Sequence, residues 1–136
     1  LRQAGADEIL VASDLQFAQS VKSLTKGHGV DVVLEIIGSL AFKESVRSLA
    51  VGGRLVMVGN LETRPVDFMP GLMILKELEF IGSYATTPDE LTQAFHLVEA
   101  GSIKPMLAAT LPLAQAAKAH EMLFEREVTG RLALEI

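Results

Sequence analysis

Glu35 places a carboxylate inside the apolar stretch VDVVLEIIG, which spans residues 30–38. A charged side chain in such a stretch needs a physical explanation. A buried carboxylate is stable only when hydrogen-bond donors or an opposite charge surround it. Glu35 precedes Gly38, where the predicted strand leaves its sheet, and no nearby residue forms an obvious acid–base partner. We therefore interpret Glu35 as a structural carboxylate that binds backbone N–H groups of neighbouring loops, rather than as a catalytic acid or base.

Glycines end three successive apolar runs, which read EIIGS at 35–39, MVGN at 57–60 and FIGSY at 80–84. A glycine allows a ligand to approach the backbone closely. In open parallel sheets, ligands bind outside the carboxyl ends of the strands. A single glycine of this kind marks an ordinary turn, whereas three in succession predict a crevice for a cofactor.

Side chains that commonly catalyse reactions or bind metals form no recognisable pattern. The chain has no cysteine, and its histidines (His28, His96 and His120) have no partners at metal-ligand spacing. His120 is expected to pack on the apolar face of a helix. No Ser–His–Asp arrangement follows from the spacing of these residue types. We predict neither catalytic residues nor metal ligands within the chain.

The elements that position these residues alternate between strand and helix. Strands are predicted at 8–12, 31–37, 54–59 and 78–84, with helices between them. Ser13, with Gln16 three residues later, has the capping-box pattern that starts a helix. The strands are continuously apolar, which indicates a parallel sheet covered on both faces. The sequence therefore predicts an α/β doubly wound fold.

The pattern changes after residue 84. Thr87, Pro88 and Glu90 mark the start of a helix, and an extended segment, another helix and a final strand follow it. We predict two domains, 1–83 and 84–136.

Composition limits the partners and the setting. The net charge is −5 and the basic residues are scattered, which argues against nucleic acid and against an anionic membrane as partners. No apolar run reaches the length that spans a bilayer. The absence of cysteine suits a cytoplasmic protein. The opening LRQAG reads as the end of a helix, so we expect the chain to be part of a longer polypeptide.

Several stretches together resemble the medium-chain dehydrogenase/reductase superfamily in order and spacing. They are GADEILVA, GHGVDVVLEIIGS, LAVGGRLVMVGN, LKELEFIGSY and residues 97–136. This superfamily contains the zinc-type alcohol dehydrogenases and the quinone oxidoreductases. The resemblance implies a partial Rossmann sheet, from the third to the sixth strand, followed by a C-terminal segment that returns to the catalytic domain.

The same resemblance implies NAD or NADP as cofactor and hydride transfer to or from an alcohol, an aldehyde or a quinone-like carbonyl in the complete enzyme. It also implies a homo-oligomer, in which the edge strand LEFIG pairs across a dimer. Backbone groups are expected to hold the nicotinamide carboxamide, an apolar pair with its neighbours to line the adenosine half, and an arginine to reach the pyrophosphate. The residues expected at the carboxamide are Val58, Gly59, Glu79 and Ile81. Those expected beside the adenosine half are Ile36, Ile37, Gly38 and Ser39, and the arginine is Arg131.

The chain also departs from the superfamily pattern. It has no G-x-G-x-x-G turn, no residue that distinguishes NAD from NADP, and none of the usual zinc ligands. In the strand order 3-2-1-4-5-6, the strand at 8–12 has lost its only neighbour. Its unpaired backbone favours rearrangement or pairing with another chain.

Two functions remain open from the sequence. The chain is either the cofactor-binding part of an oxidoreductase, or a truncated, non-catalytic domain that associates with other chains and binds no nucleotide alone. The missing phosphate turn favours the second, whereas the three glycines and Arg131 favour the first.

Overall fold

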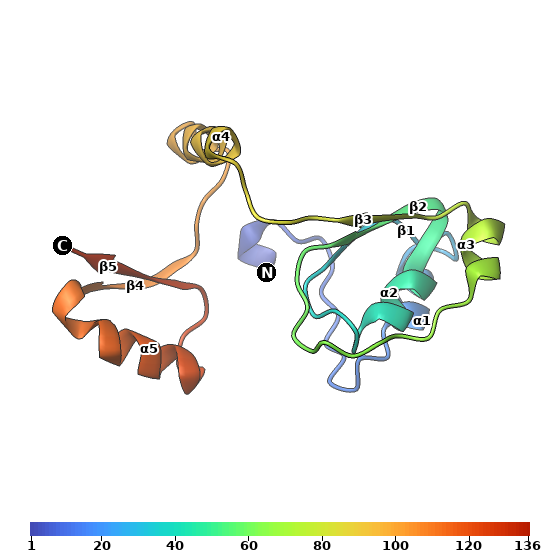
Figure 1. Ribbon diagram of the computed structural model, residues 1–136, viewed down its shortest axis with the longest axis horizontal. Helices are drawn as coiled ribbons and strands as arrows, with labels where there is room; N and C mark the ends of the chain where they lie inside the picture. Colours follow the sequence, from blue (N-terminus) through green and yellow to red (C-terminus); the bar gives the residue numbers. More distant parts are fainter. The chain divides into compact units, whose positions relative to one another are not determined.

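The computed structural model describes residues 1–136, with the side chain at position 3 excepted. The chain divides into two compact units, Leu1–Ala85 and Thr86–Ile136. Figure 1 shows their helices and strands along the chain.

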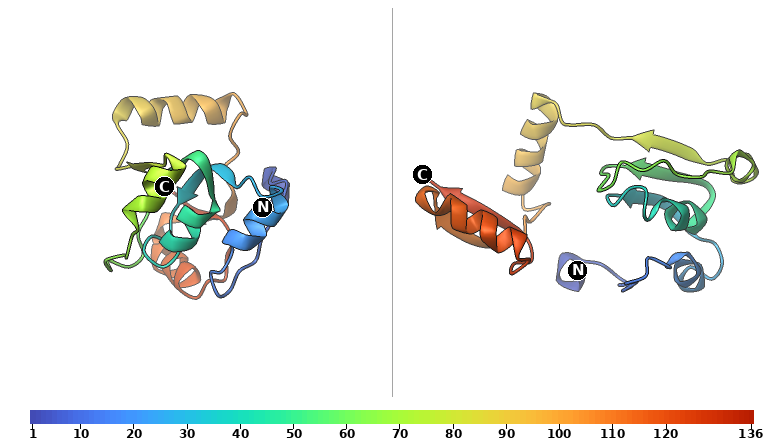
Figure 2. Two further views of the ribbon diagram at one scale, coloured as in Figure 1. Left: turned by 90° about the vertical axis from the view of Figure 1, so that its right-hand side faces the viewer. Right: turned by 60° about the horizontal axis from the view of Figure 1, so that its bottom comes forward.

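The first unit contains a three-stranded parallel sheet with the strand order β1-β2-β3. Helices connect consecutive strands and lie together on one side of the sheet (Figure 2). The elements in chain order are η1 (Arg2–Ala4), α1 (Ala18–Leu24), β1 (Val30–Glu35), α2 (Phe42–Ser48), β2 (Leu49–Met57), α3 (Pro70–Lys76) and β3 (Glu79–Gly82). Parallel strands joined by helices confirm the predicted α/β class.

The core of this unit lies between the sheet and its helices. Val46, Leu49, Leu55 and Leu78 form the buried centre. Three aromatic rings (Phe42, Phe68 and Phe80) meet edge to face beside it, with centroids 5.2–6.2 Å apart. Such contacts fix the angle of α2 and of the segment before α3 relative to the sheet.

The continuously apolar strands predicted a sheet with helices on both faces. Among the described residues, helices pack against one face only. Val32 and Leu34 of β1 are 49% and 69% exposed, and Ile81 of β3 is 41% exposed. Right-handed crossovers from β1 to β2 and from β2 to β3 put both connecting helices on the same side. An apolar, uncovered sheet face therefore remains.

The predicted strand at 8–12 is wrong, because residues 8–12 form no strand. A strand needs a neighbour for its backbone groups, and the described residues place no strand beside 8–12. Val11 is accordingly 93% exposed. The predicted cap at Ser13 is also wrong. α1 begins at Ala18, whose backbone N–H donates to the buried Glu44 carboxylate of α2 at 2.9 Å.

β2 begins five residues earlier than predicted. α2 ends at Ser48, and the glycine pair Gly52–Gly53 lies inside the strand. Gly52 has a φ of 73°, which allows the irregular pairing with β1 at this point.

The second unit contains α4 (Pro88–Glu99), β4 (Leu107–Pro112), η2 (Leu113–Gln115), α5 (Ala116–Phe124) and β5 (Arg131–Glu135). β4 and β5 pair in parallel. Thr87 and Glu90 form the predicted capping box at the start of α4. His120 of α5 is exposed, so its expected packing is wrong. Among the described residues, no helix is both long and apolar enough to cross a membrane.

Candidate functional site

Glu35 ends β1 with its carboxylate buried, and its side chain holds the loop that follows. Its Oε1 accepts hydrogen bonds from the backbone N–H groups of Ile37 at 2.7 Å and Gly38 at 3.1 Å. Its Oε2 accepts from the hydroxyl of Ser45 in α2. The interpretation of Glu35 as a structural carboxylate that binds neighbouring loop backbone is confirmed.

The loops after β1 and β2 are joined to each other by backbone hydrogen bonds. The N–H groups of Val58 and Gly59 both donate to the carbonyl oxygen of Glu35, at 2.8 and 3.2 Å, and the N–H of Leu61 donates to Ile37 at 2.9 Å. The Ser39 hydroxyl donates to the Glu62 carbonyl at 2.6 Å. Pairing between the two strands thus continues beyond the sheet and fixes both loops.

Two glycines at this end of the sheet admit no side chain. A Cβ on Gly38 would lie 2.1 Å from Asn60 Oδ1, and Gly38 also has a φ of +88°. A Cβ on Gly59 would lie 2.6 Å from the carbonyl oxygen of Ile36. The third predicted glycine, Gly82, differs, because a Cβ there would meet nothing within 4 Å. Close packing of loop on loop therefore explains the first two glycines.

A cavity of about 440 Å³ opens at these loops. Both loops contribute to its wall, together with the start of α2 and the segment after β2. Its lining residues are Ser39, Phe42, Met57, Val58, Gly59, Asn60, Arg64 and Val66. Because it lies outside the carboxyl ends of β1 and β2, it occupies the position where open parallel sheets bind ligands.

The structure brings together six of the nine predicted cofactor residues. Four lie in the loop after β1 and two directly after β2: Ile36, Ile37, Gly38 and Ser39, then Val58 and Gly59. Val58, which lines the cavity, is 48% exposed and offers apolar surface there, and Ile36 is 64% exposed in the loop after β1.

The other three predicted residues belong to other elements. Ile81 pairs with Val56 inside the sheet. Glu79 begins β3, about 10 Å from Gly82 at the carboxyl end by the rise of a parallel strand, and its carboxylate pairs with Arg54 at 3.4 Å. Arg131 begins β5 in the second unit, where it is exposed.

Sequence reasoning missed several residues of the cavity. Asn60 follows Gly59 directly, and its Oδ1 accepts a 3.4 Å hydrogen bond from the Ser39 backbone. Its place in the MVGN run was a usable signal. Phe42, Arg64 and Val66 also line the cavity, but they come from segments whose position depends on helix packing, so no local pattern marks them.

The site fits part of a nicotinamide dinucleotide and does not fit a metal ion. Apolar side chains line the cavity, as a flat ring system requires, and they come from Phe42, Met57, Val58 and Val66. Among the described residues, no three His, Asp or Glu side chains are grouped so that they could hold a metal.

Comparison with known proteins matches residues 4–134 to the model of one family, described as zinc-binding dehydrogenase. The chain belongs to this family. The predicted membership of the medium-chain dehydrogenase/reductase superfamily is confirmed, and the chain corresponds to the C-terminal part of its members. An acryloyl-coenzyme A reductase from Metallosphaera sedula is 32% identical over 130 residues, which cover 95% of the chain but only 37% of that relative.

Solved structures of family members agree with the fold. The crystal structure of AibC is 50% identical, with a TM-score of 0.90, over 98% of the chain and 37% of that protein. A mycobacterial protein solved in complex with NADPH is 29% identical, with a TM-score of 0.75, over 99% of the chain and 45% of that protein. The chain thus spans less than half the length of these relatives.

Proposed function

We propose that the loops after β1 and β2 form part of the NAD(P) site of an oxidoreductase. The cofactor supplies or accepts a hydride, and the complete protein would exchange it with an alcohol, an aldehyde or a quinone-like carbonyl. The name of the Metallosphaera sedula relative adds an acryloyl thioester to the substrate classes worth testing.

One observation carries the proposal: Glu35 holds the loops after β1 and β2 together at the carboxyl ends of the strands. The Glu35 carboxylate accepts hydrogen bonds from the loop after β1, and the Glu35 backbone carbonyl oxygen accepts hydrogen bonds from the loop after β2. A site that is already ordered before its ligand arrives loses less conformational entropy on binding. This supports a role for Glu35 as a positioning residue for the cofactor loops.

The backbone groups that are not already hydrogen-bonded determine how the chain would hold the nicotinamide. The N–H groups of Val58 and Gly59 are both engaged by Glu35, so they do not serve the ligand. A carboxamide NH₂ group would instead donate to the carbonyl oxygen of Val58. The side chains of Ile36 and Val58, which are exposed, would lie against apolar faces of the cofactor.

The test is a calorimetric titration of the folded chain with NADH and with NADPH. We expect micromolar-order binding of one of them, which would also identify the cofactor. The variant Val58→Glu should weaken that binding at least tenfold, because it places a carboxylate beside a dianionic ligand. Gly59→Val is a poor probe, since its Cβ collides with the Ile36 carbonyl.

Val51→Glu is the matched control. Val51 is on β2, the strand that Val58 directly follows, is 68% exposed, and lies toward the opposite end of β2 from the cavity. It adds the same charge without approaching the cavity, so binding should be unchanged. Equal loss of binding in both variants, or none in Val58→Glu, would argue against the assigned site.

A second candidate function rests on the uncovered sheet face. Val32 and Leu34 are 49% and 69% exposed on it, and such surface favours association. In this alternative the chain associates with other chains and binds no nucleotide alone. Light scattering after size-exclusion chromatography tests it: a stable oligomer that binds neither NADH nor NADPH would favour this candidate over the first.

Oligomerisation also belongs to the first proposal. β3 has a free edge, because the sheet order ends with it, and a homodimer would pair this edge with its symmetry-related copy. Successive N–H groups alternate sides along β3, and Ser83 donates inward to Met57 at 2.9 Å, so the Gly82 N–H faces the free edge. Gly82→Pro removes this donor and should lower the dimer fraction seen by light scattering.

A further inference from the structure

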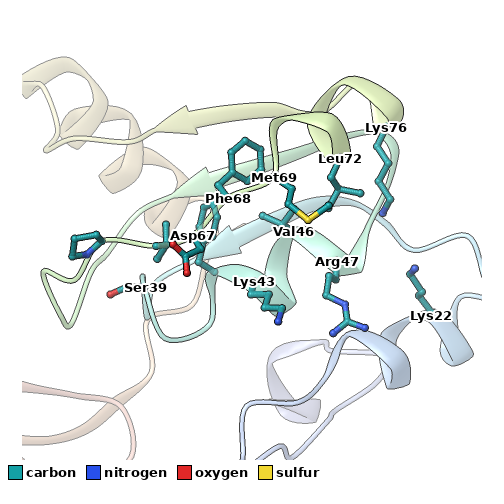
Figure 3. Close-up of a pocket in the computed structure, with 13 residues that line it drawn as sticks. Lys22, Ser39, Lys43, Val46, Arg47, Asp67, Phe68, Met69, Leu72 and Lys76 are labelled. Carbon is teal, nitrogen blue, oxygen red and sulfur yellow. The ribbon is translucent and has the colours of Figure 1, made fainter.

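A second cavity, of about 730 Å³, lies in the first unit between α2, the segment 65–69 and α3. Figure 3 shows the side chains that line it. It shares Ser39, Phe42 and Val66 with the smaller cavity and otherwise extends away from the strand ends. Apart from Ser39, no residue predicted to bind the cofactor lines it.

The floor of this larger cavity is apolar. Phe42 and Val46 come from α2, and Phe68, Met69 and Leu72 come from the segment before α3 and from α3 itself. Met69 is 72% exposed, although it borders a well-packed aromatic cluster. Apolar surface of this kind gains free energy when a hydrocarbon or aromatic group covers it.

One end of the cavity is cationic. Lys22 of α1, Arg47 of α2 and Lys76 of α3 extend toward the same region from three helices (Figure 3). Arg47 pairs with Glu44 at 2.9 Å. In the described part of the chain, neither Lys22 nor Lys76 takes part in an ion pair. The lining acid, Asp67, lies with Ser39 at the other end (Figure 3).

The protonated form of Lys76 is destabilised at this end of the cavity. Desolvation and then the charge of Lys22 lower the pKa of Lys76 below its usual value, while its ammonium donates to the Leu49 carbonyl. A nearby anion removes this electrostatic cost, because an opposite charge favours the protonated form. A neutral or cationic occupant gains nothing from this end of the cavity.

We propose that this cavity binds a phosphate monoester with an apolar body. The phosphate lies between Lys22, Arg47 and Lys76, where ammonium and guanidinium groups provide charge-assisted hydrogen bonds. The apolar body covers Phe42, Phe68 and Met69. The site shares Phe42 with the smaller cavity, but its phosphate end at Lys22, Arg47 and Lys76 belongs to the larger cavity alone.

Octyl phosphate, kept below its critical micelle concentration, is the probe. Amide NMR shifts in the ¹⁵N-labelled chain should be confined to α2, 65–69 and α3, with a Kd below about 1 mM. Inorganic phosphate and 1-octanol should each bind at least tenfold more weakly than octyl phosphate, because the first lacks the apolar chain and the second lacks the phosphate. Octyltrimethylammonium should not bind here.

The variants Lys22→Gln and Lys76→Gln should each weaken octyl phosphate binding about tenfold. Lys26→Gln is the matched control, because Lys26 is an exposed lysine directly after α1 that does not line the cavity. Val58→Glu should retain octyl phosphate while it loses nicotinamide binding, which separates this site from the cofactor site.

A measurement on the unaltered chain guards against misfolded variants. Amine acetylation followed by mass spectrometry should label Lys76 quickly, and octyl phosphate should protect Lys22 and Lys76 but not Lys26. The proposal is overturned if octanol or octyltrimethylammonium binds as tightly as octyl phosphate, or if the shifts lie on the uncovered sheet face. It also fails if the chain dimerises through this cavity and octyl phosphate neither binds nor protects.

Discussion

The two units of the chain use the same kinds of element but differ in what they bury. In Leu1–Ala85, the buried set contains apolar and polar side chains, including Leu49 and Leu55 at 0% exposure. In Thr86–Ile136, the buried residues are Leu111 at 8% and Ala119 at 4%. Parallel strands with a neighbouring helix therefore do not by themselves produce a core.

The number of layers and strands explains the difference. Three strands and the helices that cross between them enclose a volume, whereas the two strands β4 and β5 with α5 leave most of their apolar groups in solvent. Phe95 and Phe124 of the second unit are 60% and 84% exposed. Loops can be held in a fixed geometry only where a core supports them, and the candidate cofactor loops lie in the first unit.

The largest expected effect comes from the centre of the first core. Leu55→Ala removes a fully buried side chain and should lower the free energy of unfolding by about 4 kcal/mol. Leu111→Ala in the second unit should cost less than half as much, because fewer groups surround it. Urea unfolding followed by far-UV circular dichroism measures both; equal losses would contradict the contrast between the units.

Next in size is the loss of the buried carboxylate. Glu35→Ala leaves two backbone N–H groups and the Ser45 hydroxyl without their acceptor, and should cost about 3 kcal/mol. Asp31→Ala is the control, because Asp31 is an exposed carboxylate on the same strand that pairs only with His28 at the surface. A Glu35→Ala chain as stable as the control would refute the structural role.

Glycine substitutions distinguish the two loops from the edge strand. Gly38→Ala should cost about 2 kcal/mol, since it combines a positive φ with a collision against Asn60. Gly82→Ala, with open space around its Cβ, should stay within about 1 kcal/mol of the parent. Urea unfolding followed by far-UV circular dichroism compares the two variants. If Gly82→Ala lost more stability than Gly38→Ala, the loops would relax around the added methyl group.

In the second unit the expected effects are local. Thr87→Ala removes the N-cap of α4 and should lower the opening free energy of that helix by about 1 kcal/mol. Amide hydrogen exchange at α4 detects this change, whereas exchange at β1 and β2 should not change. Thr92→Ala, which loses only a bond to the Pro88 carbonyl within the helix, should have a smaller effect.

The smallest effect is a pH dependence of the same cap. Hydrogen bonds from the Thr87 backbone and then its hydroxyl lower the pKa of Glu90. The folded helix therefore favours the ionised form, and its stabilisation is present above the unfolded pKa and disappears as pH falls through the folded pKa. NMR titration of α4 should show this transition at acidic pH in the parent and not in Glu90→Gln.

Prediction succeeded where short-range patterns determine the outcome. The parallel α/β class followed from apolar strands alternating with helices, the α4 cap followed from Thr87 and Glu90, and the role of Glu35 followed from the cost of an unpaired buried charge. Each depends on residues close together in the sequence, or on a physical requirement with few solutions.

Prediction failed where the outcome depends on a distant partner. Residues 8–12 have the composition of a strand, yet they form none because no neighbour is present. α1 begins at Ala18 rather than near Ser13, because the carboxylate that caps it is Glu44 of another helix. No local pattern reports either fact.

The amino-acid sequence was sufficient to predict the fold class and the family, and six of the nine predicted cofactor residues lie in the loops after β1 and β2. Only the tertiary structure determined that Gly38 and Gly59 are required by loop packing, and that Lys22, Arg47 and Lys76 meet at one end of a cavity. The physical reason is that element type follows local periodicity, whereas these contacts depend on how separate elements pack together.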